Sequence, residues 1–532
     1  MQFSFPDRQT EVDVEGASLD ARMEPPPEVS FDATDRAVPL AMPAEEFRRV
    51  GHELVDTIAG FLATLPQRPL TAALDPDQLR TLLHADDPLP ETGSDAGALM
   101  RQTADRLIRS SLFNGHPRFF GYVTSSPAHI GMLGDLLAAA INPNVGAWTL
   151  APAATEIEAQ TIRWIAELIG YPIDCGGILV SGGNMANFIG ILAARASVGD
   201  RDVRVDGVQP ASLPPLRLYA STETHTWVQK AADLFGMGTD SIRWIPTDDE
   251  GRMDVDRLVE RVRQDREAGD RPFFVAGTAG SVSTGAVDPL REIAAVCRAH
   301  DLWFHVDGAY GGLAAAAPEC APGLEALALA DSVAVDPHKW LYAPLEAGCA
   351  LVRDPEKLRA AFSYHPPYYH FDRELTNYVD FGPQNSRGFR ALKVWLALRQ
   401  AGRAGYRQMI GDDIRLAERL LRNVDAHADL EAKGRGLSIV TFRYLPVRLA
   451  SLRRTAEGEQ RLDELNQRIL DRIQRSGEAF VSQAVIAGHF FLRACIVNFN
   501  TRAADVDALP EIVARLGREC EAEWSADAGV AR

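Results

Sequence analysis

Two charged side chains of this sequence stand directly after short apolar runs, where their surroundings could tune their chemistry. Lys339 lies in the segment 336–340 after the run 332–335, and Asp307 closes the run 302–307. A lysine that forms a Schiff base must spend time deprotonated, which desolvation beside an aldehyde cofactor favours. A buried carboxylate can keep the ring nitrogen of that cofactor protonated. The pair therefore suggests an enzyme that uses pyridoxal 5′-phosphate (PLP). The alternatives are a surface lysine and an aspartate that caps the next turn.

A glycine pair follows another apolar run, 177–180, and opens a stretch of helical composition. Glycines let the backbone N–H groups of Gly182, Gly183 and Asn184 approach a phosphate, and the dipole of the following helix favours the anion. The pattern is not the GxGxxG of dinucleotide-binding proteins. Many strand-to-helix turns contain two glycines, so the turn becomes a phosphate site only in company with Lys339.

Three further side chains have one structural and one functional interpretation each. His225 follows the run 216–220 and is either a structural histidine or a ring that stacks on the cofactor opposite the small Ala309. His338 either caps the turn beside the lysine or binds a phosphate or carboxylate. Tyr378 lies in the aromatic segment 364–386, which is either a packing loop or a lid whose phenol delivers a proton to a carbanion.

The elements that must position these residues alternate between helical stretches and short apolar runs. This alternation predicts an α/β fold with a mostly parallel sheet and helices on both faces. Ligands bind at the carboxyl ends of the strands of such sheets, so Asp307, Lys339 and the glycine pair would share one site. The expected strands are 177–180, 216–220, 241–245, 273–277, 302–307, 332–335 and 347–352.

The two ends of the chain have different patterns. Residues 1–42 are acidic and show no period, which is typical of a disordered or loosely packed tail. From Ala44, apolar residues recur at helical spacing, and a partner subunit or the body of the same chain must cover that stripe. After about residue 400, the runs 437–442 and 490–496 alternate with charged helical stretches, which predicts a smaller α+β domain.

Composition limits the partners and the compartment. The 532 residues carry a formal net charge of −18, which argues against nucleic acid and anionic membranes as partners. The six cysteines show neither CxxC pairs nor zinc-ligand spacing, so we expect free thiols and no metal site. We see no signal peptide and no apolar run long enough to span a membrane, and we expect a cytoplasmic protein.

Several segments in order resemble the group II PLP-dependent decarboxylases, the family of aromatic L-amino acid decarboxylase. The resemblance runs from about Ala44 to the helix near residue 520. The segments that carry it are 47–56, 116–122, 125–127, 151–158, 181–187, 305–312, 336–340 and 386–395. The most specific of them are 305–312, which contains Asp307, and 336–340, which contains Lys339.

The resemblance implies fold type I of PLP enzymes, with a seven-stranded sheet, and assigns a role to each matching residue. Lys339 matches the Schiff-base lysine, Asp307 the partner of the pyridine nitrogen and His225 the stacking histidine. The small residue under the ring matches Ala309, the histidine before the lysine matches His338, and the phosphate turn matches Gly183 and Asn184. Counting back from Arg390 without a gap places Tyr378 on the mobile-loop tyrosine that reprotonates the intermediate.

The family is also a homodimer with its active sites at the subunit interface. The resemblance therefore predicts a helical dimerisation segment at 43–115, a PLP-binding domain at 116–400 and a small domain at 401–532. The chain departs from the family pattern in three places. Asp336 replaces a common asparagine, 280–283 replaces a threonine-rich loop, and Asn114 stands where aromatic-specific members carry a tryptophan.

The expected reaction is α-decarboxylation of an L-amino acid, aromatic or bulky and apolar, to the amine and CO2. Acidic and diamino acids are alternative substrates. An aldehyde-forming oxidative deamination or a transamination is an alternative outcome, although aldehyde-forming relatives commonly change the loop tyrosine or the stacking histidine. A catalytically silent binding protein on the same fold is the alternative from another class.

Overall fold

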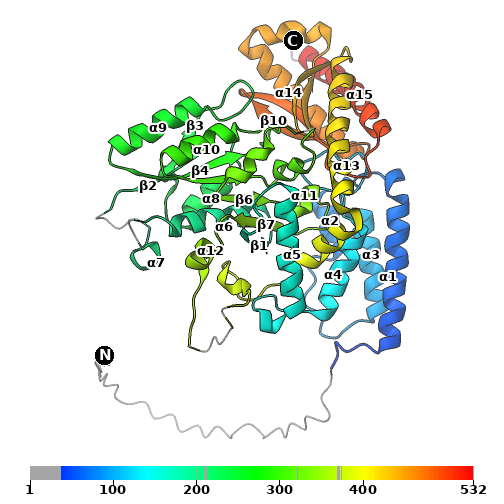
Figure 1. The fold of residues 1–532 in the computed structure, drawn as a ribbon. Coiled ribbons are helices and arrows are strands. Elements are labelled where there is room, and N and C mark those ends of the chain that lie inside the picture. The colour runs from blue at the N-terminus through cyan, green and yellow to red at the C-terminus, as the bar shows by residue number, and fades with distance from the viewer. Residues whose placement is uncertain are drawn as a thin grey trace, which may run out of the picture.

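A computed structural model of the chain describes residues 38–530 apart from 200, 201, 209–212, 320, 368–371 and 373. The predicted tail lies outside the described residues as far as residue 37. The described chain has three parts in sequence order: N-terminal helices, a large sheet with its helices, and a small sheet with its helices (Figure 1).

The large sheet has seven strands in the order β1-β7-β6-β5-β4-β2-β3. All neighbours are parallel except β7, which runs antiparallel to both β1 and β6. This confirms the predicted fold class, and each predicted strand overlaps an observed one. The strands are β1 (Gly176–Val180), β2 (Leu216–Ser221), β3 (Ile242–Ile245), β4 (Arg271–Thr278), β5 (Trp303–Asp307), β6 (Ser332–Val335) and β7 (Gly348–Val352).

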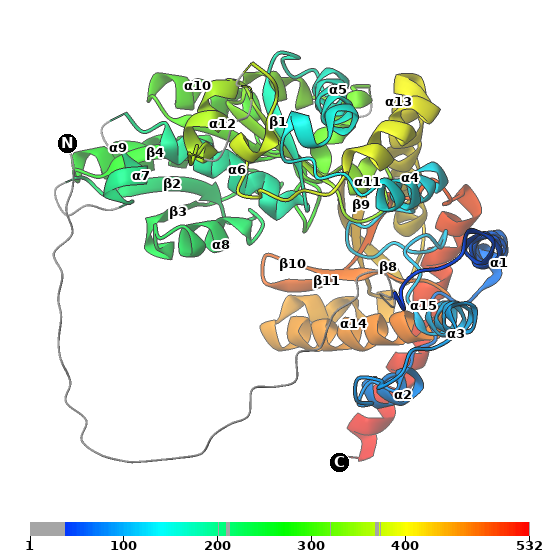
Figure 2. The ribbon, with the colours of Figure 1, turned by 90° about the horizontal axis from the view of Figure 1, so that it is seen from below.

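Helices cover both faces of this sheet, as the view in Figure 2 shows. Strands β1, β5, β6 and β7 are buried along their whole length, and sheets covered on both faces need such continuous apolar strands. Helix α6 (Gly183–Ala196) packs on β5, β6 and β7. The other helices of this layer are α4 (His129–Ile141), α5 (Pro152–Leu168), α7 (Val203–Asp206), α8 (Trp227–Leu234), α9 (Val255–Glu267), α10 (Leu290–Ala299), α11 (Pro337–Trp340) and α12 (Pro355–Phe362).

The small C-terminal sheet is antiparallel, in the order β10-β11-β9-β8, and has its own apolar core. The two strands expected from the sequence are β9 (Ile439–Tyr444) and β11 (His489–Cys495). The sequence did not indicate its edge strands, β8 (Leu430–Gly436) and β10 (Ser482–Ile486), because β8 is largely polar with a single buried residue and β10 is short and alternates buried with more exposed residues. Helices α14 (Ala456–Ser476) and α15 (Ala503–Val530) pack against each other beside this sheet.

Helix α13 (Ala391–Asp425) leads from the large sheet to the small one, and it packs on helices α4 and α5 of the large layer and on strands β8 and β9 of the small sheet. Gly402 breaks its regular geometry with a φ of 65°, a conformation that glycine adopts without strain. The predicted domain boundary at 400/401 falls beside this kink.

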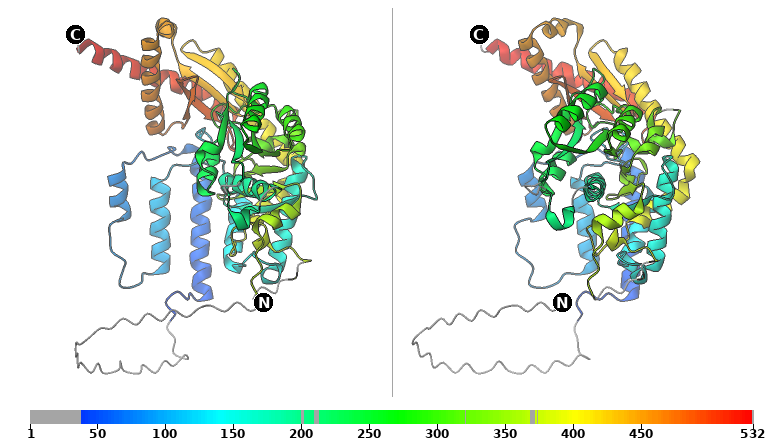
Figure 3. Two further views of the ribbon diagram at one scale, coloured as in Figure 1. Left: turned by 90° about the vertical axis from the view of Figure 1, so that its left-hand side faces the viewer. Right: turned by 60° about the vertical axis from the view of Figure 1, so that its left-hand side comes forward.

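The N-terminal helices α1 (Ala44–Thr64), α2 (Pro76–Leu83) and α3 (Ala96–Ser110) stand apart from the large sheet (Figure 3). Asp75 begins α2 with a capping box, in which its side chain accepts hydrogen bonds from the N–H groups of Asp77 and Gln78. Helix α1 buries only Val50 among its residues. The body of the same chain therefore leaves most of the predicted apolar stripe uncovered.

Candidate active site

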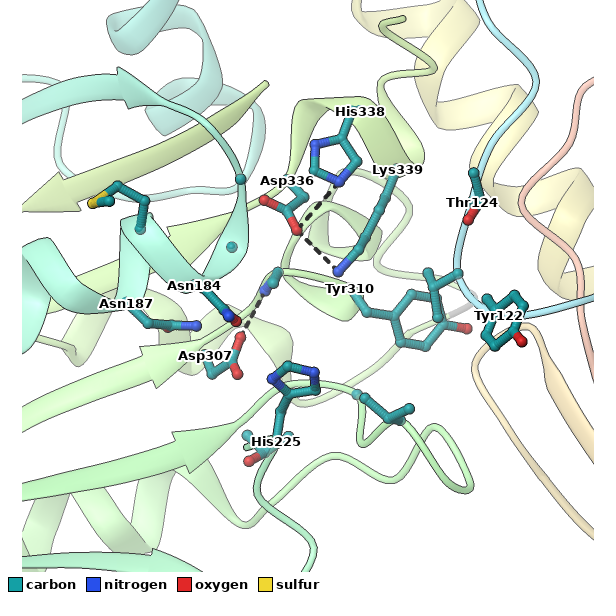
Figure 4. Close-up of a pocket in the computed structure, with 18 of the residues that line it drawn as sticks. Tyr122, Thr124, Asn184, Asn187, His225, Asp307, Tyr310, Asp336, His338 and Lys339 are labelled. Carbon is teal, nitrogen blue, oxygen red and sulfur yellow. Dashed lines mark hydrogen bonds and ion pairs between the residues drawn. The ribbon is translucent and has the colours of Figure 1, made fainter. Parts of the chain in front are cut away.

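The carboxyl ends of β1, β2, β4, β5 and β6 open into one cavity of about 780 Å³, which the small sheet closes from the other side. Figure 4 shows the side chains that point into it. The cavity brings together every predicted site residue except Tyr378. These residues are Lys339, Asp307, His225, Ala309, His338, Gly183 and Asn184.

Lys339 lies on the short helix α11 directly after β6, and its ammonium group pairs with Asp336. The Nζ atom of Lys339 lies 2.9 Å from Oδ2 of Asp336, and Asp336 is 2% exposed. The second carboxylate oxygen, Oδ1, is buried without a hydrogen-bond partner. The lysine is therefore held at the cavity wall by a carboxylate that retains an unused acceptor.

Asp307 ends β5 and stays 7% exposed on the floor of the cavity. Its Oδ1 accepts a hydrogen bond of 3.1 Å from the backbone N–H of Ala309, which fixes the carboxylate beside that small residue. His225 is open to the cavity on the loop after β2. Partial desolvation lowers the pKa of His225, whereas the Asp307 carboxylate acts to raise it. The imidazole is thus neutral near neutral pH.

The glycine pair forms a tight turn between β1 and α6. Gly182 has a φ of 131°, a conformation that other residues rarely adopt. A Cβ at Gly183 would lie 2.8 Å from Oδ2 of Asp336 and 3.0 Å from the Cβ of Ala309, so only glycine fits there. No side chain caps the N-terminus of α6. Its first N–H groups consequently remain available for an anion.

Comparison with known proteins identifies the family of this chain. The family model described as the pyridoxal-dependent decarboxylase conserved domain matches residues 76–445. The chain belongs to this decarboxylase family. It is 33% identical over 473 residues to an aromatic-L-amino-acid decarboxylase of Bacillus atrophaeus, covering 88% of this chain and 94% of that protein.

Two further relatives bear on the chemistry of this decarboxylase. A phenylacetaldehyde synthase of Petunia hybrida is 31% identical, over 85% of this chain and 90% of its own. The crystal structure of Oryza sativa TDC with PLP and tryptamine superposes with a TM-score of 0.83 at 29% identity, covering 91% of this chain and 99% of that one. The protein is therefore a PLP-dependent amino-acid decarboxylase, as its sequence motifs predicted.

The residues of the cavity fit the cofactor. The turn at Gly182 and Gly183 leaves room and N–H donors for a phosphate, and Asp307 provides a carboxylate for a protonated ring nitrogen. Thr278, at the end of β4, lines the same cavity with a buried hydroxyl that has no hydrogen-bond partner. A bound cofactor with polar substituents would satisfy such a group.

The structure does not bring Tyr378 to the cavity. This residue is 1% exposed in the large core, and the guanidinium carbon of Arg387 lies 4.7 Å from the centre of its ring. Burial raises the pKa of Tyr378 well above its usual value. The ungapped count from Arg390 thus led to a residue that is buried in the core of the single chain, outside the cavity. Of the other tyrosines in that segment, Tyr368 and Tyr369 lie outside the described residues.

Asn114 does not line the cavity either, although it matches a substrate-pocket position of the family. Sequence reasoning missed Arg493 of β11, which does line it. Arg493 is 2% exposed and donates to the carbonyl of Tyr122 over 3.0 Å, while its Nε and Nη2 are buried without partners. A strand of apolar residues interrupted by one arginine, in the run 490–496, was the available signal.

Asp413 of α13 is a second residue that the sequence did not indicate. Its Oδ2 accepts hydrogen bonds from Nε1 of Trp340 over 2.9 Å and from the hydroxyl of Tyr342 over 2.8 Å. The segment that follows Lys339 is therefore fixed from behind by a buried carboxylate. Burial raises the pKa of Asp413 to about 7.

Two observations concern the rest of the molecule. The cysteines among the described residues, Cys175, Cys297, Cys349, Cys495 and Cys520, are all unpaired. Within the described part of the chain, no helix is long and apolar enough to cross a membrane.

Proposed function

We propose that this decarboxylase converts an aromatic or bulky apolar L-amino acid to its amine and CO2. The observation that carries the proposal is the convergence of Lys339, Asp307 and His225 at neighbouring strand ends in one cavity. When bound there, PLP supplies an electron sink for the bond between the α carbon and the carboxylate.

The residues of the chain have distinct parts in this reaction. Lys339 would hold the cofactor between turnovers and release it to the amine of the substrate. Asp307 would keep the pyridine nitrogen protonated and thus keep the sink effective. Neutral His225 would cover the ring face opposite Ala309 and exclude water from the reacting carbon.

Arg493 is the group that receives the carboxylate of the substrate. Its unpaired Nε and Nη2 are buried in the cavity wall, and buried arginine donors without acceptors are costly. A carboxylate would satisfy both donors with charge-assisted hydrogen bonds. An acidic substrate could use the same group for its distal carboxylate, so Arg493 also bears on the alternative substrate class.

Two observations favour an aromatic or bulky substrate. The outer wall of the cavity carries Tyr122, Val123 and Leu345, which offer apolar and aromatic contact. The Bacillus atrophaeus relative is an aromatic-L-amino-acid decarboxylase by name.

The similarity to a phenylacetaldehyde synthase keeps aldehyde formation as the second candidate outcome. The presence of His225 in the cavity favours plain decarboxylation.

We further propose that the protein is a homodimer. Helix α1 buries only Val50, and α4 exposes several large apolar side chains in the single chain. A large apolar surface of this kind marks an interaction site. The exposed residues of α4 are Leu133, Leu136, Leu137 and Ile141. Light scattering during size-exclusion chromatography should give twice the chain mass, and Leu136→Glu should shift the protein toward monomer. The cytoplasmic location stays a prediction.

A substrate panel tests the proposed reaction. The purified protein should be incubated with the common amino acids and their hydroxylated and diamino variants, while CO2, amine, aldehyde and peroxide are measured. We expect equal amounts of CO2 and amine from an aromatic substrate. Aldehyde and peroxide as main products would replace this proposal with the aldehyde-forming one. A protein that stays colourless with added PLP and releases no CO2 would favour a silent binding protein.

A further inference from the structure

Asp336 is a site residue whose chemistry the proposed reaction does not use. It lies between the phosphate turn and Lys339, and it contacts both. Its Oδ2 is 2.9 Å from Nζ of Lys339, and the same oxygen would meet a Cβ at Gly183 at only 2.8 Å. A phosphate bound at this turn therefore becomes the neighbour of a buried carboxylate.

His338 faces the same oxygen from the other side. Its Nε2 lies 3.6 Å from Oδ2 of Asp336, as a dashed line marks in Figure 4. Its Nδ1 lies 2.7 Å from the carbonyl oxygen of Ala347, a distance that requires a hydrogen on Nδ1. The contact of 3.3 Å from the N–H of Ala347 to Nδ1 is then not a hydrogen bond. In the neutral ring the bare Nε2 consequently faces the carboxylate.

Nε2 of His338 and Oδ2 of Asp336 are both acceptors, so a hydrogen bond between them requires one added proton. In the cofactor-free protein, the ammonium of Lys339 donates to Oδ2 of Asp336 in place of that proton. Burial lowers the pKa of His338, so the ring is neutral near neutral pH and free to accept a proton, while Asp336 acts to raise that pKa. The other charged or titratable groups that face this pair are His225, Asp307, Glu346 and Cys349.

Cofactor binding changes this balance of charge. The phosphate brings an anion to the Gly182–Gly183 turn. The ammonium of Lys339 condenses with the aldehyde carbon and one water leaves. One proton and the positive charge stay on that nitrogen, which is now bonded to the cofactor and no longer serves Asp336 as a free ammonium. A buried carboxylate beside a second anion favours uptake of a proton.

We propose that Asp336 and His338 form a proton-holding pair that takes one proton from solvent when the cofactor phosphate binds and Lys339 is engaged. The proton lies between Nε2 of His338 and Oδ2 of Asp336 and offsets the charge of the phosphate. An asparagine at position 336 would need no such proton. The aspartate thus makes cofactor retention depend on pH in this chain, and the inference rests on the proposed role of Lys339.

Calorimetry of cofactor binding tests the pair. PLP is titrated into cofactor-free wild type, D336N and E346Q at about pH 7, in PIPES and in imidazole buffer, neither of which carries a primary amine. The difference in heat between buffers with different ionisation enthalpies gives the protons taken up. Glu346→Gln is the matched control, since it removes a carboxylate that lines the same cavity but pairs with Arg390, whereas Lys339 pairs with Asp336. Circular dichroism establishes that each variant is folded.

We expect wild type and E346Q to take up about one proton more per site than D336N. In wild type and E346Q, the affinity for PLP should fall by about tenfold per pH unit above neutrality relative to D336N. Equal uptake by wild type and D336N would overturn the inference, and so would a folded D336N that no longer binds PLP. A pH-independent affinity of the wild type would overturn it without any variant.

Borohydride reduction and peptide mapping separate this inference from the proposed function. Attachment of the cofactor at Lys339 together with equal proton uptake would remove only the proton-holding pair. Absence of attachment at Lys339 would remove the proposed role of the lysine itself.

Discussion

The inner and outer walls of the cavity differ in how completely one chain builds them. On the inner wall, at the strand ends, Asp336 is 2% exposed and Asp307 is 7% exposed. On the outer wall, Tyr122 is 60% exposed and Leu345 is 61% exposed. The groups for cofactor chemistry are thus fixed within the single chain, whereas the surface that would meet a substrate side chain is open.

This difference teaches where chemistry and specificity reside in the fold. On the inner wall, the N–H of Ala309 holds the Asp307 carboxylate and the ammonium of Lys339 pairs with Asp336, so both positions follow from the ends of β5 and β6. The residues of the outer wall come from loops and from the small domain, and a partner subunit would complete their surroundings. We therefore expect inner-wall substitutions to abolish the reaction and outer-wall substitutions to change its substrate.

Replacing the lysine of the inner wall should have the largest effect. Lys339→Ala removes the attachment point of the cofactor, and we expect CO2 release to fall by roughly 10³-fold or more. The measurement is release of CO2 from the preferred substrate under saturating PLP. Lys230→Ala is the control, because Lys230 lies on the nearby helix α8 but does not line the cavity. Retained turnover in the Lys339 variant would place the chemistry elsewhere.

Asp307→Asn should come second, with a loss of kcat of about 10²-fold or more, because the amide cannot keep the ring nitrogen protonated. Asp331→Asn is the matched control. Asp331 precedes β6 at the opposite end of the same sheet and accepts from the N–H of Phe304 over 2.8 Å. An equal loss of activity in both variants would contradict this role of Asp307, because the effect would then not depend on a position at the carboxyl ends of the strands.

Arg493→Gln probes the boundary between the two walls. We expect KM for the substrate to rise by about 10-fold or more, since a buried charge-assisted hydrogen bond is lost. The exposed Arg454→Gln on the small domain should leave KM unchanged. Steady-state kinetics with one neutral and one acidic amino acid distinguish the alternatives. A loss confined to the acidic substrate would move Arg493 from the α-carboxylate to the distal one.

Asp413, which accepts hydrogen bonds from the segment that follows Lys339, should make the stability of the protein depend on pH. The folded-state pKa of Asp413 is raised from 3.8 to about 7, so its stabilising contribution is complete below about pH 4 and is lost as pH rises through 7. Asp413→Asn cannot ionise. Relative to wild type, its free energy of unfolding should therefore improve by about 2–3 kcal/mol between pH 5 and pH 8. Denaturant titrations at the two pH values measure this, and a constant difference would contradict the raised pKa.

Tyr378→Phe should have the smallest effect. Because its ring is buried beside Arg387 and outside the cavity, we expect amine formation to stay within about twofold of wild type. Product analysis by chromatography decides the matter. A switch from amine to aldehyde would restore the proton-delivering role that the sequence suggested for this residue.

The inner wall could be predicted from the sequence because each of its residues is tied to a strand end. Asp307 and Lys339 stand next to continuous apolar runs, and the parallel sheet brings such positions together. Tyr378 could not be placed in this way, because the segment before α13 has no period that fixes its register. Arg493 was not predicted because it reaches the cavity from the small domain, and no local sequence pattern shows how the two sheets face each other.

The most direct test of the account is the site of covalent cofactor attachment. The protein is loaded with PLP, reduced with borohydride and digested, and the modified peptide is sequenced by mass spectrometry. The account predicts loss of the visible absorption band and a pyridoxyl phosphate group on Lys339 alone. Modification of a different lysine, or a stable visible band with no modified peptide, would contradict it.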